Sequence, residues 1–445
     1  SLGGYGLSNR INFVLSSSRK RKLENNRVSF FTCFQSALNA AAELSTKIFV
    51  IGGKSVYEEA IQHPNCEKIY LTHTNFPSRE TSVTRETSVT RETSVTRETN
   101  DLQVFPKLHA RDFYLKQIVE SGTEMVVLHD QSELEIKYDI AEYHRIGLIQ
   151  NNHVQYWGER GYLQAVKDII DMGEIREDRT GIGTKSQFGL TFKYDLTRGF
   201  PLLTTKKMFT KGIFEELLWF LRGSTDIREL QAKKVKIWDG NSSREYLDSI
   251  GLTDRQEGDG GPIYGFQFRH FGAKYVHCNT DYSHQGFDQV ADVIHQIRTN
   301  PQSRRIMISL WNPPDLNQMV LQPCHVLYQF WVSKVHKTLH CSLYQRSGDM
   351  GLGVPFNIAS ASLLTHLIAK LTDLQVGTLT HTIGDAHVYL NHIEPLKKQL
   401  LRTPQPFPVL EIRDRKQQSV EDFITDDFVI KCYFPDPAIK MDMAV

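Results

Sequence analysis

The sequence predicts an α/β protein with more than one domain, and three observations support this prediction. The chain has 445 residues, which is enough for about two or three domains. An apolar run typical of a buried strand, IFVI at residues 48–51, is followed by a Gly-Gly turn and a helical stretch, KSVYEEA. Later in the chain, residues 212–223 have the apolar spacing of a helix, and IMISLW at residues 306–311 has the composition of a buried strand.

A change in composition near HRIGLIQNNH indicates a domain boundary, because aromatic residues and glycines are more frequent after it. We therefore expect a first domain at residues 1–147 and a second at residues 148–445. In the first domain, INFVLSSSRK (residues 11–20) and the alternating EIKYDIAEY (residues 135–143) have the pattern of strands. Residues 79–99 repeat the polar unit RETSVT, which is too short for a solenoid, so we expect a surface insertion without a function of its own.

The net charge of +1 creates no global field that would favour nucleic acid or a membrane surface. No stretch approaches the ~20 apolar residues that a membrane-spanning helix needs, and the first residues do not resemble a signal peptide. The six cysteines are scattered without metal-ligand spacing, which predicts reduced thiols in an intracellular, cytoplasmic protein. HVYLNH at residues 387–392 comes closest to a metal-binding pair, and we predict no metal there.

One cysteine, Cys324 in QPCHVLYQFW, raises the question of whether it fills the core or acts as a nucleophile. Most free cysteines are small buried hydrophobes. A reactive cysteine needs nearby cations that lower the pKa of its thiol, and it needs access to a cleft.

The stretch GIFEELLWFLRG, residues 212–223, has one broad apolar face when it is folded as a helix. Glu216 falls between Trp219 and Phe220 on this helix, so we expect its carboxylate to be buried. Burial disfavours the charged form and raises the pKa, which suits a group that transfers protons. A salt-bridged or solvent-reaching glutamate is the alternative.

Several arginines stand beside predicted strands and turns. Arg179 lies in the glycine-rich REDRTGIGT, Arg304 and Arg305 precede an apolar strand, and Arg346 and Ser347 follow another strand. Guanidinium groups bind phosphate oxygens through paired hydrogen bonds, and cations also stabilise a thiolate. If these arginines converge they form an anion site, whereas each one alone is equally compatible with an ordinary surface arginine.

In VPFNIASASLLTHLIAKL the chain passes from a loop into a helix with a buried leucine-rich face. Asn357 lies near its start, where it could cap the helix. Its side-chain amide could also read a base edge, because it offers both a donor and an acceptor.

Segments in a fixed order resemble those of thymidylate synthase: RTGIGT, FPLLTTKK, EELLWFLRGST, IWD, SRRI, QPCH, QRSGDMGLGVPFN, GDAHVYLNH and the ending KMDMAV. The resemblance covers about residues 155–445. Four segments of the first part, INFVLSSS, FVIGGKSVYEEAI, IYLTHT and YDIAEY, resemble dihydrofolate reductase. The chain as a whole is similar to the bifunctional dihydrofolate reductase–thymidylate synthases. This resemblance implies an α/β fold throughout: a thymidylate synthase fold, whose large mixed sheet packs back-to-back across a dimer, preceded by a partial dihydrofolate reductase-like α/β domain.

The resemblance also implies an activity, the reductive methylation of dUMP to dTMP with 5,10-methylenetetrahydrofolate, which leaves as dihydrofolate. Cys324 would attack C6 of the uracil ring as a thiolate. C5 would then take the methylene group, and the folate would give up a hydride. Asn357 would read the O4/N3 edge of uracil, Glu216 would organise proton transfers, and Asp349 would anchor the pterin.

The same resemblance assigns the binding residues. The dUMP phosphate would be held by residues of both subunits, which makes a homodimer a requirement of the site: Arg179, Arg346 and Ser347, with Arg304 and Arg305 of the partner subunit. The remaining matches are Tyr264 and His325 for a water network, His387 and Tyr389 for the sugar 3′-hydroxyl, Lys206, Ile237, Trp238, Leu352 and Phe356 for folate, and Val445 as a C-terminal lid that excludes water.

In the first domain, five consecutive residues match the turn that binds the NADPH phosphates in dihydrofolate reductases: Gly52, Gly53, Lys54, Ser55 and Val56. Residues 16–18 match a second cofactor contact. The first strand of that family, its substrate loop and the helix that bears its catalytic acid do not precede the equivalent segments here, although Thr72 matches the partner of that acid. We therefore predict synthase activity, and reductase activity with NADPH only for a full-length form whose first residues lie before Ser1.

Two other functions fit part of the pattern. A dCMP hydroxymethylase would use the same thiol chemistry but would have aspartate in place of Asn357, because cytosine presents the opposite hydrogen-bond pattern. A non-catalytic protein that binds RNA or a partner would need neither Cys324 nor Glu216 nor the arginines. Asn357 and Cys324 together therefore favour a uracil-specific enzyme.

Overall fold

The computed structural model describes residues 12–15, 28–31, 34–42, 48, 50, 54–62, 66, 68–75, 108, 113–127, 133–145 and 156–443. The repeat at residues 79–99, the turn glycines Gly52 and Gly53, residues 16–18 and Val445 lie outside the described residues, and nothing is described of the side chains of Lys54, Ser55 and Thr72. The chain forms two compact units: Ser1–Ile69, Thr74–Lys107 and Gly122–Tyr138 in one, and Tyr70–His73, Leu108–Ser121 and Asp139–Val445 in the other.

The described residues of the first part of the chain form strands and two helices. Strands β1 (Asn12–Leu15) and β2 (Val28–Phe31) pair in parallel, and α1 (Phe34–Ala42) and α2 (Lys54–Gln62) follow them. Strands β3 (Lys68–Asn75), β4 (Phe113–Val127) and β5 (Glu133–Arg145) form a sheet in the order β3-β5-β4. The strands predicted within residues 11–20 and 135–143 and the helix predicted after the glycines are confirmed. The strand predicted at residues 48–51 is not, because its two described residues, Ile48 and Val50, are not in a strand.

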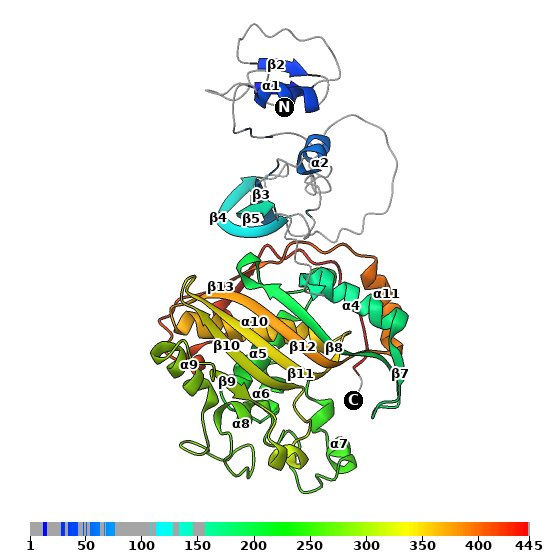
Figure 1. Ribbon diagram of the computed structural model, residues 1–445, viewed down its shortest axis with the longest axis vertical. Helices are drawn as coiled ribbons and strands as arrows, with labels where there is room; N and C mark the ends of the chain where they lie inside the picture. The colour runs from blue at the N-terminus through cyan, green and yellow to red at the C-terminus, as the bar shows by residue number, and fades with distance from the viewer. Residues whose placement is uncertain are drawn as a thin grey trace. The chain divides into compact units, whose positions relative to one another are not determined.

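A seven-stranded sheet forms the centre of the second part (Figure 1). Its strands are β6 (Tyr156–Trp157), β7 (Glu174–Arg176), β8 (Thr184–Asp195), β9 (Met307–Ser309), β10 (His325–Ser333), β11 (Thr338–Asp349) and β12 (Gln375–Tyr389). They run in the order β6-β8-β12-β11-β10-β9, with β7 paired to β8. Because β11 is parallel to β12 and β6 to β8, while the other pairs are antiparallel, the sheet is mixed, as expected. A separate antiparallel pair joins β13 (Val409–Ile412) and β14 (Phe428–Lys431).

Helices cover one face of this sheet. They are α4 (Gly158–Met172), α5 (Thr210–Leu221), α6 (Arg228–Ala232), α7 (Arg244–Ser249), α8 (Tyr264–Arg269), α9 (Gln289–Thr299), α10 (Gly353–Leu371) and α11 (Ile393–Leu400). Helix α10 packs on β11 and β12, α4 packs on β8, and α5 packs on α10. The order outward from the strands is therefore sheet, α10, α5.

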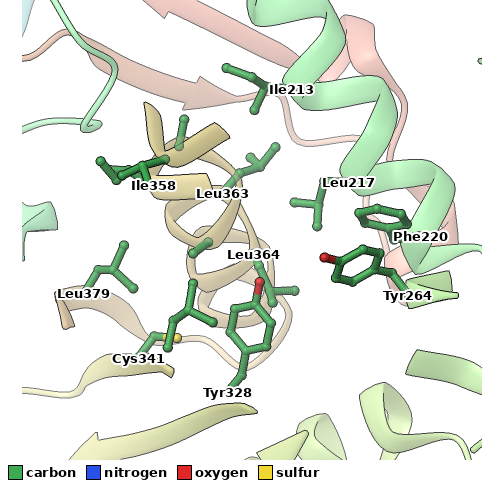
Figure 2. Close-up of a cluster of buried hydrophobic side chains, with 14 of the residues drawn as sticks. Ile213, Leu217, Phe220, Tyr264, Tyr328, Cys341, Ile358, Leu363, Leu364 and Leu379 are labelled. Carbon is green, nitrogen blue, oxygen red and sulfur yellow. The ribbon is translucent and has the colours of Figure 1, made fainter. Parts of the chain in front are cut away.

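The core lies between the sheet and α5 (Figure 2). Leu217 of α5, Leu363 and Leu364 of α10, and Cys341 and Leu379 of the strands belong to this cluster, and all five are buried. Helix α10 is apolar nearly all round, and by length and composition it could cross a membrane, so the statement that no stretch approaches such a span was wrong for this helix. Since 78% of its most apolar stretch of 18 residues is buried inside the protein, α10 is the central core helix.

The other face of the sheet carries no helix among the described residues. Side chains alternate along the strands, so Phe330 and Leu343 enter the core while Trp331 and Tyr344 point the opposite way. Trp331 is 58% exposed and Tyr344 is 40% exposed. A hollow of about 400 Å³ on this face is lined by Trp157, Lys193, Gln329, Trp331, His340, Cys341, Ser342, Thr378 and Thr380. An aromatic, partly apolar sheet face of this kind is a surface on which another chain can pack.

We expect Leu364→Ala to destabilise the second part by about 2–5 kcal/mol, because it leaves a cavity at the centre of the layered core. Leu401→Ala is the matched control, since Leu364 is 0% exposed and Leu401 is 88% exposed. Urea unfolding followed by tryptophan fluorescence measures both variants. Equal stability of the two variants would contradict this description of the core.

Candidate active site

Cys324 lies in the turn immediately before β10, and its thiol is free and partly exposed. Its backbone N–H donates to the Tyr264 hydroxyl at 2.7 Å. Tyr264 is the first residue of α8 and is itself buried against Phe220 of α5. The cysteine is therefore held at the junction of the sheet and the helical layer, and it is not a core filler.

Arg346 near the end of β11 fixes the turn that carries the cysteine. Its backbone N–H donates to the Cys324 carbonyl at 2.8 Å. Its guanidinium donates to the Pro323 and Gln322 carbonyls, both at 2.9 Å, and lies 5.7 Å from the centre of the Trp311 ring. These contacts place a permanent positive charge beside the thiol.

The pKa of the Cys324 thiol is nevertheless raised above its ordinary value. Burial raises it most, and the charge of Arg346, a hydrogen bond with the Tyr264 side chain and the charge of Arg179 lower it, in decreasing order. Arg346 and Arg179 thus act on this thiol, as a nucleophile requires, but burial outweighs them within one chain. Since desolvation penalises the thiolate, ionisation of this cysteine depends on every cation that the site can hold.

Arg179 is presented on a tight turn. The carboxylate of Asp178 accepts hydrogen bonds from the backbone N–H groups of Thr180 and Gly183, both at 2.8 Å, and from the Thr180 hydroxyl at 2.6 Å. Gly181 and Gly183 have φ angles of +73° and +80°, which glycine adopts without strain. The Arg179 side chain is exposed, and its charge acts on the pKa values of both Cys324 and Tyr389.

Glu216 lies on α5, as predicted, and is largely screened from solvent. Trp238 donates its indole N–H to the Glu216 carboxylate at 2.8 Å. Burial raises the pKa of Glu216 to about 7, although the hydrogen bond from Trp238 lowers it. A carboxyl group with this pKa can gain or lose a proton near neutral pH, which suits proton transfer.

His325 follows Cys324 in sequence and is buried on the first position of β10. Its Nδ1 lies 2.9 Å from the Tyr328 hydroxyl. Burial lowers the pKa of His325 to about 4, against a smaller opposite effect of Asn357. The imidazole is therefore neutral at physiological pH, and its role is that of a hydrogen-bonding group.

Asn357 lies within α10, whose N-cap is Leu352, so the capping alternative was wrong. Its amide oxygen accepts a hydrogen bond from Gln345 Nε2 at 2.9 Å. Gln345 Oε1 in turn lies 2.8 Å from Nε2 of the buried His381, and burial lowers the pKa of His381 to about 3. A neutral histidine that donates through Nε2 orients the Gln345 amide with its oxygen toward His381. The Gln345 N–H₂ group then faces Asn357 and orients the Asn357 amide with its oxygen toward Gln345.

The residues predicted for the sugar and the phosphate lie on neighbouring strands. Ser347 on β11 is opposite Asp385 on β12, and His387 is two residues further along β12. His387 Nδ1 lies 3.3 Å from a carboxylate oxygen of Asp385, which also accepts an ion pair from Arg176 at 3.1 Å. The rings of His387 and Tyr389 meet edge to face with their centres 5.3 Å apart. Ser347, His387 and Tyr389 therefore lie near the C-terminal ends of β11 and β12.

Asp349 ends β11, where its carboxylate accepts hydrogen bonds from the backbone N–H groups of Gly351 at 2.8 Å and Leu352 at 3.1 Å. Lys206 is buried nearby and donates through Nζ to the Gly351 carbonyl. Burial lowers the pKa of Lys206 to about 8, while Asp349 and Glu159 raise it. A carboxylate and an ammonium group thus approach the same short turn.

The segment that carries Lys206 is anchored by a buried carboxylate. Glu159 at the start of α4 accepts hydrogen bonds from the backbone N–H groups and hydroxyls of Thr204 and Thr205, at 2.6–2.9 Å. Burial still raises the pKa of Glu159 above its ordinary value. Arg402 adds a hydrogen bond to the Thr205 carbonyl at 2.7 Å. These contacts hold Lys206 in place without help from a ligand.

Two predicted residues are not brought to this site within one chain. Arg304 and Arg305 are exposed on the segment before β9. Within residues 156–443, no hydrogen bond or ion pair links either guanidinium to Cys324, Arg179 or Arg346. Ile237, Leu352 and Phe356 are partly buried, and Ile237 and Phe356 pack against the core.

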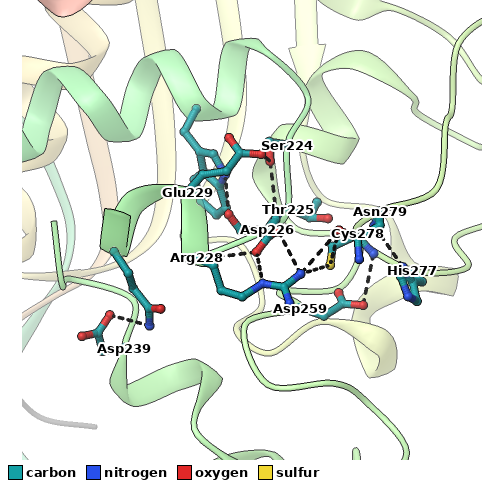
Figure 3. Close-up of polar contacts among 12 residues, drawn as sticks. Ser224, Thr225, Asp226, Arg228, Glu229, Asp239, Asp259, His277, Cys278 and Asn279 are labelled. Carbon is teal, nitrogen blue, oxygen red and sulfur yellow. Dashed lines mark hydrogen bonds and ion pairs between the residues drawn. The ribbon is translucent and has the colours of Figure 1, made fainter. Parts of the chain in front are cut away.

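Cys278 is a useful contrast, because it is also free and partly exposed. Arg228 donates to its sulfur at 3.6 Å and also forms an ion pair with Asp226 (Figure 3). Burial and the carboxylates of Asp259 and Asp226 raise the pKa of the Cys278 thiol to about 11 despite Arg228. A nearby arginine alone therefore does not distinguish a nucleophile, because neighbouring carboxylates can outweigh its effect on the pKa of the thiol.

The described part of the chain holds no cluster of three or more histidine, cysteine, aspartate or glutamate residues that could bind a metal. Sequence reasoning gave no role to Gln345 or His381, and it considered His392 only as one end of a possible metal-binding pair. The partners of these side chains lie far away in the sequence, although Gln345 is itself the first residue of the QRSGDMGLGVPFN motif.

Comparisons with known proteins agree with this geometry. A family model described as thymidylate synthase matches residues 160–445, and one described as dihydrofolate reductase matches residues 1–103. Bifunctional dihydrofolate reductase-thymidylate synthase 2 of Arabidopsis thaliana is 44% identical over 458 residues, which cover 99% of this chain and 78% of the relative. The bifunctional enzyme of Paramecium tetraurelia is 43% identical over 100% of this chain and 88% of its own. Thymidylate synthase of Homo sapiens is 58% identical over 65% of this chain and 91% of its own.

We expect Glu216→Gln to stabilise the protein relative to wild type at alkaline pH. The native state holds the Glu216 proton up to a pKa of about 7 instead of 4.5, so the native state binds more protons than the unfolded state between these values. Wild-type stability therefore falls as pH rises through this window, by about 2–3 kcal/mol between pH 5 and pH 8. The variant lacks this fall.

Urea unfolding at pH 5 and pH 8 measures the effect, with the exposed Glu245→Gln as control. A difference between Glu216→Gln and wild type that stays constant across this pH range would show that the carboxyl group is not held neutral by burial.

Proposed function

The chain belongs to the family of bifunctional dihydrofolate reductase–thymidylate synthases, and we propose that Cys324 is the nucleophile of its synthase site. The family activity is the conversion of dUMP to dTMP with 5,10-methylenetetrahydrofolate, which supplies the one-carbon group and the hydride and leaves as dihydrofolate. The protein is thus a methyltransferase of nucleotide biosynthesis. The observation that supports this site best is the threefold attachment of Arg346 to the turn of Cys324.

The nucleophile works through its ionised form. The thiolate of Cys324 forms a bond to C6 of the uracil ring, and C5 becomes nucleophilic as electron density moves onto O4. Burial raises the pKa of the thiol, so the charges of Arg346 and Arg179 must offset the cost of the thiolate. The same two cations, with the hydroxyl of Ser347, would bind the dUMP phosphate.

Asn357 would select uracil over cytosine. Its amide oxygen already accepts from Gln345, which leaves the amide N–H₂ group to donate to O4 of uracil while the second lone pair of the oxygen accepts from N3–H. Cytosine would present an amino group where O4 stands, and two donors would face each other. This arrangement supports dUMP as substrate and speaks against the dCMP hydroxymethylase alternative.

Three further groups would handle protons and the reacting ring. Glu216, with a pKa raised by burial to about 7, would exchange protons near O4. The neutral His325 and the hydroxyl of Tyr264 would order water beside it. His387 and Tyr389 would bind the 3′-hydroxyl of the sugar.

The folate would bind beside the dUMP site. Asp349 would accept hydrogen bonds from the pterin, since its carboxylate is held by the backbone of Gly351 and Leu352. The other proposed folate contacts are Lys206, Ile237, Trp238, Leu352 and Phe356. Val445 would close over the bound ligands. Burial has already removed water from Lys206 and Trp238, which reduces the desolvation cost of binding.

The test is incubation with 5-fluoro-dUMP and methylenetetrahydrofolate, followed by intact-protein mass spectrometry. We expect a covalent adduct that contains both ligands on the wild type and none on Cys324→Ser, because fluorine at C5 blocks the later steps after the sulfur–carbon bond has formed. Turnover of dUMP by Cys324→Ser should fall by at least about a thousandfold.

Cys278→Ser is the matched control, since Cys278 is also free and partly exposed. It should form the adduct as the wild type does. An adduct that persists in Cys324→Ser, or that is lost in Cys278→Ser, would assign the nucleophile elsewhere. No adduct from the folded wild type would overturn the synthase site.

We also propose that the protein acts as a homodimer that pairs through the open face of the seven-stranded sheet. Trp331 and Tyr344 expose aromatic surface there, and burial of such surface drives association. Arg304 and Arg305 lie at the β9 edge of the same sheet, exposed and without an ion pair among the described residues. They would reach the dUMP phosphate of the partner subunit, so that neither subunit has a complete site alone.

Mixing two inactive variants tests this sharing. Arg304→Ala/Arg305→Ala and Cys324→Ser should each be inactive alone. After subunit exchange at equal amounts, half of the dimers are mixed and each holds one intact site, so about a quarter of wild-type activity should return. A mixture of Cys324→Ser with Arg346→Ala should recover none, because both residues belong to the same half-site. No recovery in the first mixture would contradict a shared site.

For the first part of the chain, we propose a reductase-like domain at residues 1–147 and a synthase domain at residues 148–445. Reductases of this family use NADPH, and α2 begins at Lys54 directly after the two turn glycines, which suits a phosphate at a helix N-terminus. The free cysteines at positions 66, 278, 324, 341 and 432 support the proposed cytoplasmic, reducing location.

A further inference from the structure

His392 is a buried histidine between two hydrogen-bond acceptors. It ends the short helical turn Leu390–His392, and its side chain is 0% exposed. Its Nε2 lies 2.7 Å from the backbone carbonyl of Asp442. Its Nδ1 lies 3.6 Å from a carboxylate oxygen of Asp349. The ring thus spans the space between the folate-side carboxylate and the C-terminal tail.

The chemistry of these two neighbours determines the charge of the ring. A backbone carbonyl only accepts hydrogen bonds, so Nε2 must carry a proton. The Asp349 carboxylate also accepts, so Nδ1 is attracted to it only when that nitrogen is protonated as well. At 3.6 Å, Nδ1 and Asp349 are at ion-pair distance, and Nδ1 has no hydrogen-bond partner in the described structure. A neutral imidazole has one N–H and binds only the Asp442 carbonyl, whereas an imidazolium ion is also attracted to the Asp349 carboxylate.

The residues around the ring allow this charge. From β11, Asp349 faces it; from β12, the Tyr389 ring packs at 5.6 Å and His387 stands beside Asp349. Lys206 is the opposing cation. Burial lowers the pKa of His392, but Asp349 and the Asp442 carbonyl outweigh burial and Lys206, so the pKa of His392 is raised above its ordinary value.

The close approach depends on a glycine. A Cβ atom at Gly351 would lie 2.6 Å from His392 Nδ1 and 3.2 Å from the sulfur of Met441. The turn after Asp349, the histidine and the tail therefore pack with no space for a side chain at this position.

The tail reaches His392 along a fixed path. The backbone N–H of Asp436 donates to the Thr204 carbonyl at 2.8 Å, and Arg402 donates to the Pro437 carbonyl at 2.6 Å. The contact from His392 to Asp442 is the last of these attachments among the described residues. It is also the attachment nearest to the C-terminal end of the described residues.

We propose that His392 is a positioning residue that fastens the C-terminal tail, residues 436–443, to the folate-side carboxylate of Asp349. The proposal rests on the proposed synthase function, because Asp349 is taken there as the pterin anchor. Folate binding and tail order are then coupled through one side chain, while dUMP binding is not. The fastening needs the imidazolium ion, so it is present at low pH and is lost as pH rises through the raised pKa of His392.

Two variants separate the parts of this role. His392→Phe removes both contacts, whereas His392→Gln keeps an N–H that can donate to the Asp442 carbonyl but carries no charge toward Asp349. In the full-length dimer at pH 6.5, we expect KM for methylenetetrahydrofolate to rise about tenfold in His392→Phe and less in His392→Gln. The Kd for dUMP should stay within about twofold of wild type in both. Between pH 6 and pH 9 the folate KM of wild type should rise more steeply than that of either variant, because Glu216 and Lys206 titrate in all three proteins and His392 only in wild type.

The tail itself supplies a readout that does not need activity. Hydrogen exchange followed by mass spectrometry should show faster exchange of residues 436–443 in both variants, with the core of α10 unchanged. His366→Gln is the matched control: His366 lies on α10 against Phe200, far along the sequence from the tail, and its Nε2 has no hydrogen-bond partner in the described structure. It should leave tail exchange and folate KM unchanged.

Two outcomes would overturn the proposal, and a third would separate it from the proposed synthase function. Wild-type tail exchange and folate KM in His392→Phe would overturn the proposal. An equal loss of dUMP and folate binding together with faster exchange throughout the domain would also overturn it, because it would show a general packing role. Tail exchange that responds as expected in a protein that forms no 5-fluoro-dUMP adduct would keep the fastening of the tail and reject the synthase site instead.

Discussion

Arg346 makes three hydrogen bonds to the segment that ends at the reactive cysteine, and the rest of the site depends on this attachment. One bond comes from its backbone and two come from its guanidinium, so strand β11 and the turn before β10 move as one body. Removal of the side chain would take away the charge beside Cys324 and would also leave the carbonyls of Gln322 and Pro323 without partners. A lysine could supply the charge but not the two directed bonds, because its ammonium group lacks the planar fork.

Burial is the second constraint, and it acts against the charges. It raises the pKa of Cys324 and of Glu216 and lowers the pKa of His325 and Lys206, so each of these groups is pushed toward its neutral form. These four groups therefore carry less charge than the same side chains would in water. Each further arginine that joins the site would favour the thiolate in surroundings of low dielectric constant, whereas a dianionic phosphate would oppose it. The arginines thus divide by function: Arg346 is fixed by the fold, while Arg179 stays exposed and available to a ligand.

The sequence predicts the parts of this site that depend on local pattern. The apolar spacing of α5 predicts that Glu216 is buried, and the motifs around Cys324 and Arg346 predict that they belong to one site. The network from His381 through Gln345 to Asn357 could not be predicted, because it joins β12, β11 and α10 and has no periodicity. The balance at Cys324 could not be predicted either, since residue types show which cations are near but not how much water is excluded. The strand predicted at residues 48–51 was wrong because a short apolar run does not by itself distinguish a strand from other structures.

The strands of the large sheet carry a different set of side chains on each face. Residues that alternate along β10 and β11 serve a core on one side and an open aromatic surface on the other, so a shift of register by one residue would exchange the two sets. The pairing of β10 with β11 also sets Arg346 opposite the cysteine turn, and the pairing of β11 with β12 sets Ser347 opposite Asp385. A change that disturbs the open face would therefore be felt at the cysteine even in a single subunit, because both are fixed by one ladder of backbone hydrogen bonds. Formation of the proposed dimer and assembly of the site would then both depend on the register in which β10 pairs with β11.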